Sequence, residues 1–138
     1  FSASPKAASA VLSPKKINED VVVPVSRIPA LVAAMRDLSQ RYALPIVCFG
    51  HAGNGNVHVN LLPRDQAELA RAEECLREVF AVVIRLDGTL SGEHGIGLAK
   101  RDFMALAVDA SALALMRRVK SAFDPDGILN PGKLLPPP

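Results

Sequence analysis

The sequence has 138 residues, of which 49% are hydrophobic, and its formal net charge is +2 at pH 7. This length predicts one soluble domain whose core is large enough to be stable without disulfides or a structural metal. The 16 Lys and Arg residues are scattered, and one Tyr and five Phe leave few rings for base stacking, which argues against a nucleic-acid-binding protein.

The first residues, FSASPKAASA, are rich in Ser, Ala and Pro and show no periodicity. We therefore expect residues 1–15 to be a disordered or boundary segment. No apolar run reaches the roughly 18 residues that span a bilayer, and no signal peptide opens the chain. Cys48 and Cys75 lie in apolar segments without C-x-x-C spacing, which is typical of reduced core thiols and favours a cytoplasmic location.

The first predicted elements are a strand and a helix. The β-branched run DVVVP at residues 20–24 predicts a short strand. Ser26 is then predicted to cap a helix with Pro29 in its first turn, because apolar side chains recur at helical spacing up to Tyr42.

A hairpin, a second helix and a further strand are predicted next. The segments PIVCFGH and NVHVNLL predict two strands joined by a tight turn at residues 53–55. Asp65 and Glu68 have the spacing of a capping box, and an apolar stripe follows to about Arg85. GTLSG at residues 88–92 fits a fourth strand. The order β-α-β-β-α-β predicts an α+β, ferredoxin-like fold, in which two helices cover one face of an antiparallel sheet and leave the other face free.

The C-terminal part predicts further helices and an extended tail. A weaker helical stretch runs from Leu98 to about Ala107, and Asp109 opens a clearer helix that DPDG ends. The helical spacing predicts that four apolar side chains of this helix point inward: Leu113, Met116, Val119 and Phe123. The tail ILNPGKLLPPP is punctuated by proline and is expected to be extended.

Two of the three histidines lie in the predicted hairpin. Side chains alternate along a strand, so His58 shares the free face with Asn56 and Asn60. If the hairpin turns through residues 52–55, His51 lies opposite Asn56, and His58 is its diagonal neighbour at about 7–8 Å between Cα atoms. Two imidazoles at this separation can converge on one metal ion, although a register slip of one residue would separate them.

The third histidine follows Glu93 in the segment SGEHGIG. Its glycines permit a bent backbone that turns both Glu93 and His94 toward one site. His51, His58 and Glu93 would then form a two-histidine, one-carboxylate site with open positions, suited to zinc, manganese or iron(II) acting on a substrate. The same residues also fit plain structural roles, as hydrogen-bonded surface histidines beside turn glycines, and Lys16 as a solvated charge.

Four segments in one order resemble the C-terminal part of FAD-linked 2-hydroxyacid dehydrogenases and oxidases: INEDVVVP, GHAGNGNVHVNLLP, SGEHGIGLAKRDFM and AFDPDGILNPGKLLP. This group contains D-lactate dehydrogenase, the glycolate oxidase D subunit and D-2-hydroxyglutarate dehydrogenase. The resemblance runs from about Lys16 to Leu135 and predicts that residues 16–138 are the C-terminal cap and substrate domain of such an enzyme.

The resemblance implies roles for particular residues. His51 and His58 match the two metal-ligating histidines of the group, and Glu93 matches the third ligand. His94 matches the base beside the flavin, and Asn60 matches an asparagine that contacts the substrate.

Two further matches concern the ends of the similar region. Lys16 is similar to a lysine that binds the substrate carboxylate, but Asn18 fits that position as well. Asn130, in the NPGK segment, is similar to the stretch that returns toward the flavin domain, and it is assigned to cofactor binding.

The resemblance also implies the cofactors and partners. These are FAD, bound mainly by a separate FAD-binding domain, and a divalent metal, either zinc or else manganese or iron. A small 2-hydroxyacid would be the substrate. The resemblance also implies an electron acceptor, through which the enzyme would be able to associate with the periphery of a membrane. The metal would act as a Lewis acid, and His94 would accept the hydroxyl proton while the flavin takes the hydride. The isolated chain is expected to fold, to bind FAD weakly and to be inactive.

Two departures from the group and two alternatives accompany this interpretation. The hairpin has Gly-Asn-Gly at residues 53–55 where many relatives have Gly-Asp-Gly, and an arginine found ahead of the first strand in relatives is missing. A stand-alone ferredoxin-like module that binds a small ligand or partner without catalysis is the main alternative. A metal-dependent hydrolase is disfavoured, since no nucleophile or second acid is apparent.

Overall fold

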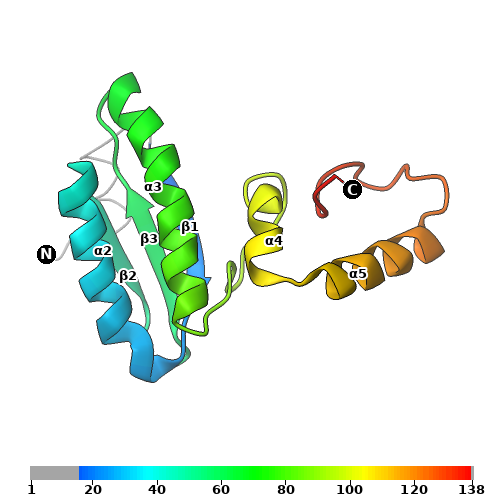
Figure 1. The fold of residues 1–138 in the computed structure, drawn as a ribbon, viewed down its shortest axis with the longest axis horizontal. Helices are drawn as coiled ribbons and strands as arrows, with labels where there is room; N and C mark the ends of the chain where they lie inside the picture. Colours follow the sequence, from blue (N-terminus) through cyan, green and yellow to red (C-terminus); the bar gives the residue numbers. More distant parts are fainter. Residues whose placement is uncertain (1–15, 138) are drawn as a thin grey trace, which may run out of the picture. The chain divides into compact units, whose positions relative to one another are not determined.

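The computed structural model describes residues 16–137, so the prediction for residues 1–15 lies outside the described part of the chain. The fold is of the α+β class, as predicted (Figure 1). The chain divides into two compact units, one ending at Glu93 and the other beginning at His94, and each is described by itself. Among the described residues, none of the helices has the length and apolar character needed to cross a membrane.

The first unit is built on a three-stranded antiparallel sheet in the order β1-β3-β2. Its strands are β1 (Ile17–Val22), β2 (Ile46–His51) and β3 (Asn56–Leu61). In the β2–β3 hairpin, His51 lies opposite Asn56, which is the predicted register. The central position of β3 buries all six of its residues, including the polar ones that alternation assigns to the face away from the helices.

Two helices pack side by side on one face of this sheet (Figure 1). A short 3-10 turn, η1 (Val25–Arg27), leads into α2 (Ile28–Tyr42), and α3 is formed by Gln66–Arg85. The apolar stripes of both helices are buried and form the core with the apolar face of β3: Leu31, Met35, Leu38, Val79, Phe80, Val83, Val57, Val59 and Leu61.

The two helices begin in different ways. Asp65 caps α3 as predicted, since its carboxylate accepts a hydrogen bond of 2.8 Å from the Glu68 backbone N–H. Ser26 does not cap α2, and that prediction is wrong. The chain enters α2 through the 3-10 turn instead, where the Arg27 N–H donates to the Pro24 carbonyl at 2.7 Å.

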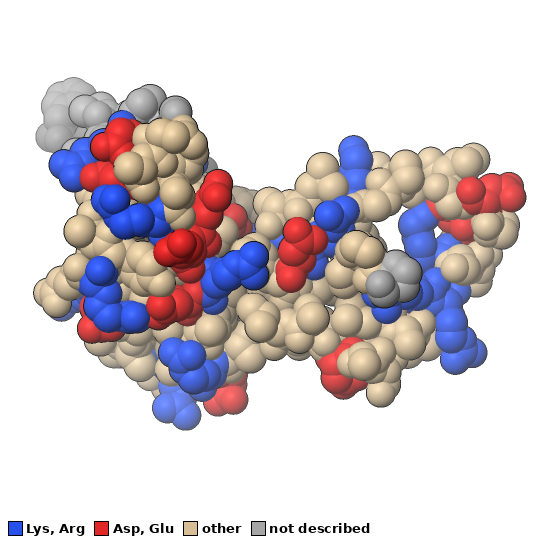
Figure 2. All heavy atoms as spheres, turned by 45° about the horizontal axis from the view of Figure 1, so that its top comes forward, with Lys and Arg blue, Asp and Glu red and all other residues tan. Residues whose placement is uncertain are grey.

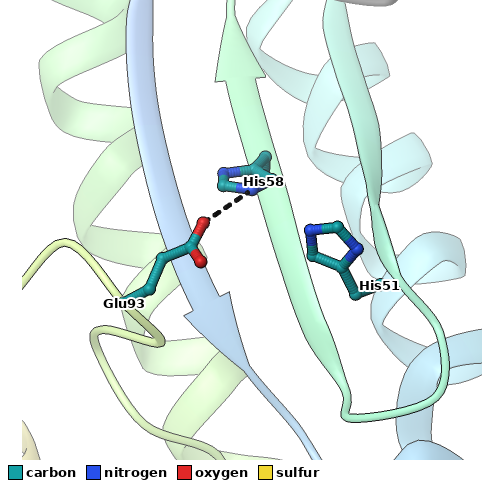
Figure 3. A group of neighbouring side chains, drawn as sticks. All are labelled: His51, His58 and Glu93. Carbon is teal, nitrogen blue, oxygen red and sulfur yellow. Dashed lines mark ion pairs between the residues drawn. The ribbon is translucent and has the colours of Figure 1, made fainter.

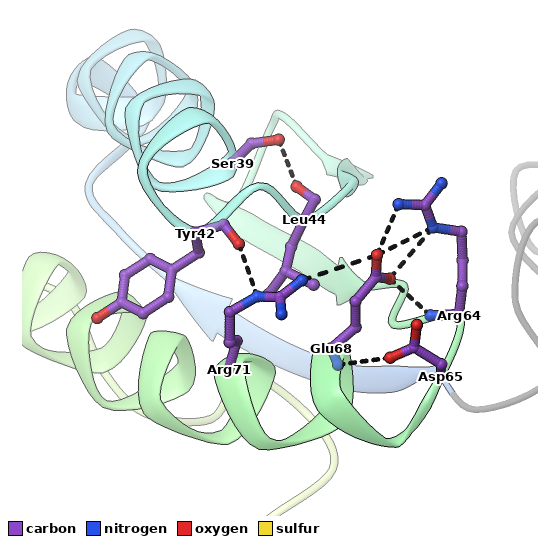
Figure 4. A network of polar contacts seen from close by, with 7 residues as sticks. All are labelled: Ser39, Tyr42, Leu44, Arg64, Asp65, Glu68 and Arg71. Atoms are coloured by element: carbon purple, nitrogen blue, oxygen red, sulfur yellow. Dashed lines mark hydrogen bonds and ion pairs between the residues drawn. The ribbon is translucent and has the colours of Figure 1, made fainter.

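A polar network joins the end of α2 to the start of α3 (Figure 4). The Glu68 carboxylate accepts hydrogen bonds from the Arg64 backbone N–H at 2.8 Å and from its guanidinium at 2.6 Å. These bonds favour the ionised form and lower the pKa of Glu68 to about 2. Arg71 of α3 donates to the carbonyl of Tyr42, the last residue of α2, at 3.2 Å, and it also forms an ion pair with Glu68 at 3.8 Å. Arg71 therefore connects the end of α2 to the buried carboxylate of Glu68.

The predicted fourth strand is reduced to one antiparallel bridge between Thr89 and Val22. The bridge lies on the outer edge of β1, but the four-stranded ferredoxin-like order is not confirmed, because the described sheet has three strands. The physical reason is a competing acceptor. The backbone N–H groups of Gly92 and Glu93 donate to the side chain of Asp20 rather than to the backbone of β1.

The second unit is helical. It contains the 3-10 turn η2 (Arg101–Phe103), the short helix α4 (Met104–Ala107) and the longer helix α5 (Ala110–Phe123). Asp109 caps α5 as predicted, by accepting a hydrogen bond of 2.8 Å from the Ala112 N–H. Lysines and arginines alternate with acidic side chains on the face drawn in Figure 2, in agreement with the scattered charge of the sequence.

The apolar stripe of α5 is mostly exposed. Leu113 is buried as predicted, but Met116, Val119 and Phe123 are not, so the prediction of an inward stripe is wrong at these three positions. Helical spacing identifies an apolar face, but the burial of that face depends on packing partners that the spacing does not specify. The three side chains line an open groove of about 570 Å³ together with residues of α4 and the tail.

Candidate metal centre

The hairpin places two imidazoles on the sheet face opposite the helices. His51 is exposed at the end of β2, and His58 is only 6% exposed in the middle of β3. Their ring centroids are 6.4 Å apart at an interplanar angle of 75°. Gly55 holds the turn, because its φ is +77° and an added Cβ would lie 2.0 Å from the Val23 carbonyl oxygen. The turn chemistry therefore sets the register that brings the histidines together.

A carboxylate from a distant segment completes the cluster. The Glu93 Oε1 atom lies 3.4 Å from His58 Nε2, and the three side chains point toward one another (Figure 3). His51, His58 and Glu93 each offer one ligand atom within 4.8 Å of the others. Two ligands at about 2.1 Å from one ion are at most about 4 Å apart, so small side-chain rotations suffice for a shared divalent ion.

The donor set fits a metal that acts on a substrate. Two imidazole nitrogens and one carboxylate oxygen suit zinc, manganese or iron(II), and three ligands leave coordination positions open. His51 and Glu93 are exposed, which leaves the cluster accessible from one side. His58 is held from another side by Phe49, whose ring centroid is 5.2 Å from that of the imidazole.

Two buried amide oxygens lie on either side of His58 along β3. The Oδ1 atoms of Asn56 and Asn60 are buried and have no hydrogen-bond partner among the described residues. Such atoms are rare in folded proteins, because leaving a buried acceptor unpaired costs free energy. Their position is consistent with a polar ligand or ordered water beside the cluster.

The predicted substrate residues are partly brought together. Asn60 is fully buried, and its Nδ2 donates a long hydrogen bond of 3.5 Å to the Val47 carbonyl. Asn18 lies directly opposite Asn60 in the β1–β3 pair and is exposed. Lys16 immediately precedes β1 and is also exposed. Asn18 and Asn60 therefore share the sheet face that carries His58.

Two predicted site residues belong to the second unit. His94 is its first residue, follows Glu93 directly and is exposed. Asn130 is exposed in a turn where it adopts a left-handed φ of 47°. Its carbonyl accepts a hydrogen bond of 3.3 Å from the Lys133 N–H. The roles of His94 and Asn130 stay predictions.

The turn before Asn130 is held by one buried carboxylate. Asp124 accepts hydrogen bonds of 3.0 Å from the backbone N–H groups of Ile128 and Leu129, and it pairs with the Lys120 ammonium. The ammonium and these N–H donors lower the pKa of Asp124. This arrangement orders the start of the tail within its own unit.

Asp20 is a further residue near the cluster, and it was not predicted from the sequence. This carboxylate is fully buried in β1 and accepts hydrogen bonds from the loop that carries Glu93. The available signal was a charged residue next to the β-branched run of the first strand, because a buried charge requires nearby partners.

An antiparallel sheet with two helices on one face and a histidine–carboxylate cluster on the other defines an α+β domain with a candidate metal site. The chain matches the family model described as "FAD linked oxidases, C-terminal domain" over residues 2–134. The chain therefore belongs to this family.

Curated relatives are similar over most of the chain. The glycolate oxidase subunit GlcD of Bacillus subtilis is 40% identical over 92% of this chain and 27% of its own length. The D-2-hydroxyglutarate dehydrogenase of Stutzerimonas stutzeri is 35% identical over 85% of this chain and 26% of its own length. A probable mitochondrial D-lactate dehydrogenase of Danio rerio is 36% identical over 88% of this chain and 25% of its own length. The chain thus spans about a quarter of the length of these relatives.

Proposed function

We propose that the intact protein is an FAD-dependent oxidoreductase that converts a small D-2-hydroxyacid into the 2-oxoacid. The chain described here would be its C-terminal cap, which supplies metal ligands and a base. The observation that carries the proposal is the convergence of His51, His58 and Glu93 in a chain of this family.

The substrate class is proposed from the names of the relatives. Those names refer to glycolate, D-2-hydroxyglutarate and D-lactate. These compounds share a hydroxyl group next to a carboxylate, and they differ in the rest of the molecule. We therefore propose the 2-hydroxycarboxylate unit as the recognised group.

His51, His58 and Glu93 would hold the divalent ion. The fit rests on their mutual distances and on the nitrogen and oxygen donors that they offer. When bound, the ion would polarise the hydroxyl and carboxylate oxygens of the substrate. The buried Oδ1 atom of Asn60 would orient the substrate beside the cluster, and Lys16 or Asn18 would bind its carboxylate.

The described residues do not fit the main binding site of FAD. None of α2, α3 and α5 is preceded by the glycine-rich turn that brings a helix N-terminus close to a pyrophosphate. We propose that another part of the intact protein binds most of the cofactor, with Asn130 contributing from this chain. FAD, when bound, would accept the two electrons of the oxidation.

His94 is proposed as the base. Oxidation of the hydroxyl carbon breaks its C–H and O–H bonds, and the hydroxyl proton needs an acceptor as the carbonyl forms. A histidine is suited to accept a proton near neutral pH. His94 follows the ligand Glu93 directly, and steric geometry disfavours two adjacent residues in one coordination shell, so we assign His94 to proton transfer rather than to the metal.

Metal titration tests the proposed site. The intact protein should bind one zinc or cobalt ion per chain, and His58→Ala and His51→Ala should lose that binding. His94→Ala is the matched control, because it removes the one histidine outside the cluster and should keep the ion. Dye reduction with glycolate, D-lactate and D-2-hydroxyglutarate then identifies the substrate. Equal metal uptake by the wild type and His58→Ala would reject the site.

A further inference from the structure

Asp20 is a buried carboxylate on the edge strand β1, and its side chain is on the sheet face that carries the cluster. It lies on β1 directly opposite His58 in the β1–β3 register, so both side chains are on the same face. Its exposed fraction is 0%. A buried charge is stable only with strong partners, and the partners of Asp20 therefore indicate what the residue does.

Three of the partners of Asp20 belong to the segment that carries Glu93. The Asp20 Oδ2 atom accepts hydrogen bonds from the backbone N–H groups of Gly92 at 2.7 Å and of Glu93 at 2.6 Å. The Ser91 hydroxyl lies 3.3 Å from both carboxylate oxygens. Hydrogen bonds to an ionised acceptor are shorter and stronger than neutral ones, so Asp20 holds the main chain of a metal-ligand residue itself.

A close steric contact fixes the same segment from a second direction. A Cβ added to Gly92 would lie 2.8 Å from three side-chain atoms of Asn56. Asn56 is on β3, two residues before His58, and is 4% exposed. The loop is thus pressed against one neighbour of His58 and hydrogen-bonded to another, which leaves Glu93 little freedom of position.

Asp20 is not itself a member of the cluster. Among the described residues, the group of ligand atoms within reach of one another consists of His51, His58 and Glu93. The Oδ2 atom of Asp20 is already the acceptor of two backbone N–H groups. The residue therefore acts on the site through the loop.

We propose that Asp20 is a positioning residue, which holds Glu93 beside His58 and thereby sets the affinity of the site for a divalent ion. This inference rests on the metal site proposed above. Residues that orient metal ligands typically change affinity by 10- to 100-fold when they are replaced. The same range is expected for Asp20→Asn, which keeps the shape of the side chain but removes its charge and one acceptor.

The first measurement is hydrogen exchange in the metal-free intact protein. The amides of Gly92 and Glu93 should be protected in the wild type and should exchange at least about tenfold faster in Asp20→Asn. Asp87→Asn is the matched control, because Asp87 is an exposed aspartate just ahead of the loop with a left-handed φ of 59° that asparagine also tolerates. Its exchange should equal that of the wild type.

The second measurement is the dissociation constant for Co²⁺ in a double-mutant cycle. Asp20→Asn should weaken binding by 10- to 100-fold, and Asp87→Asn should leave it unchanged. If Asp20 acts through Glu93, Asp20→Asn should cause little further loss in a Glu93→Gln background, because the ligand is already removed. Additive losses would show that Asp20 acts by another route and would overturn the proposal.

A milder variant covers the case in which Asp20→Asn fails to fold. Ser91→Ala removes one donor to the carboxylate and leaves the buried charge paired with two backbone N–H groups. It should accelerate exchange of the loop and weaken Co²⁺ binding by a few-fold. A folded Ser91→Ala protein with wild-type exchange and wild-type affinity would overturn the proposal.

The outcomes separate this inference from the proposed function. If the wild type binds Co²⁺ and Asp20→Asn binds it equally well, Asp20 is not a positioning residue, but the metal site stands. If Asp20→Asn exchanges the loop amides faster but keeps its affinity for Co²⁺, the positioning role is likewise rejected and the metal site stands. If the wild type binds no divalent ion, the proposed metal site fails, and the role of Asp20 fails with it.

Discussion

The Nε2 atom of His58 lies 3.4 Å from the Oε1 atom of Glu93, although one residue is in the central strand and the other follows the second helix. The fold therefore places this carboxylate directly beside the imidazole. A site whose ligands are already close loses little conformational entropy when it binds, and such preorganisation favours affinity.

Replacement of His94 should separate proton transfer from metal binding. In the intact protein, His94→Asn should keep its metal content and lower kcat by roughly 10²–10⁴-fold, which is the usual contribution of a general base. Metal stoichiometry and kcat with a 2-hydroxyacid are the measurements. Glu93→Gln is the paired variant and should lose its activity and most of its metal affinity, so that it is isolated with little metal, although the two histidines still bind Co²⁺ weakly. A His94→Asn protein without metal, or with a nearly normal rate, would contradict the two assignments.

Gly92→Ala should destabilise the first unit. The new Cβ would lie 2.8 Å from the amide of Asn56, which is buried in β3 and has little room to move. Overpacking of this kind costs about 1–3 kcal/mol in the free energy of unfolding. Gly53→Ala is the control, since an added Cβ there meets nothing within 4 Å. The free energies of unfolding of both variants, measured in urea, test this prediction. Equal values would show that the loop has room for a side chain at Gly92.

Acid should weaken the fold through Glu68. Its pKa is about 2 in the folded protein, below its ordinary value of 4.5, so the unfolded chain binds more protons between these values. Stability from this group is therefore complete above about pH 4.5 and is lost as the pH falls toward 2.

Glu68→Gln should accordingly lower stability at neutral pH and flatten its dependence on acid. The measurement is the free energy of unfolding between pH 2 and 7, with Glu74→Gln as an exposed control on the same helix. An unchanged acid profile in Glu68→Gln would contradict the contribution assigned to the contacts with Arg64.

Two phenylalanines should respond very differently to replacement by alanine. Phe80 of α3 is fully buried, and Phe80→Ala should cost about 3–5 kcal/mol in stability. Phe123 is 82% exposed, and Phe123→Ala in this 138-residue chain should change stability by no more than about 0.5 kcal/mol. Denaturant midpoints of the two variants are the test. A large loss for Phe123→Ala would mean that this ring is covered in solution.

The hairpin and the helices were predictable because their signals are local. Gly-Asn-Gly supplies the turn, strand alternation places His58 beside His51, and the apolar period and Asp65 define α3. The metal-ligand candidates followed from this register, together with a resemblance that places Glu93 at the same site. The three side chains lie close enough to share an ion, with ligand atoms within 4.8 Å of one another, and their role as metal ligands stays a prediction.

The remaining features depend on contacts that no local pattern contains. The Asp20 carboxylate and the Gly92 N–H are 72 positions apart in sequence, and their hydrogen bond replaces the pairing expected of a fourth strand. Likewise, the spacing of Met116 and Phe123 identifies an apolar face of α5, but it contains no information on which residues cover that face.

The outer edge of β1 has a consequence for solubility. Within residues 16–137, Thr89 is the one bridge partner on this edge, so much of the strand is a possible template for pairing with another chain. Natural sheets protect such edges with inward-pointing charges and covering loops. Asp20 provides the charge and holds the loop at Gly92 and Glu93. The same carboxylate should therefore oppose aggregation, and Asp20→Asn should form oligomers at lower concentration than Asp87→Asn in light scattering.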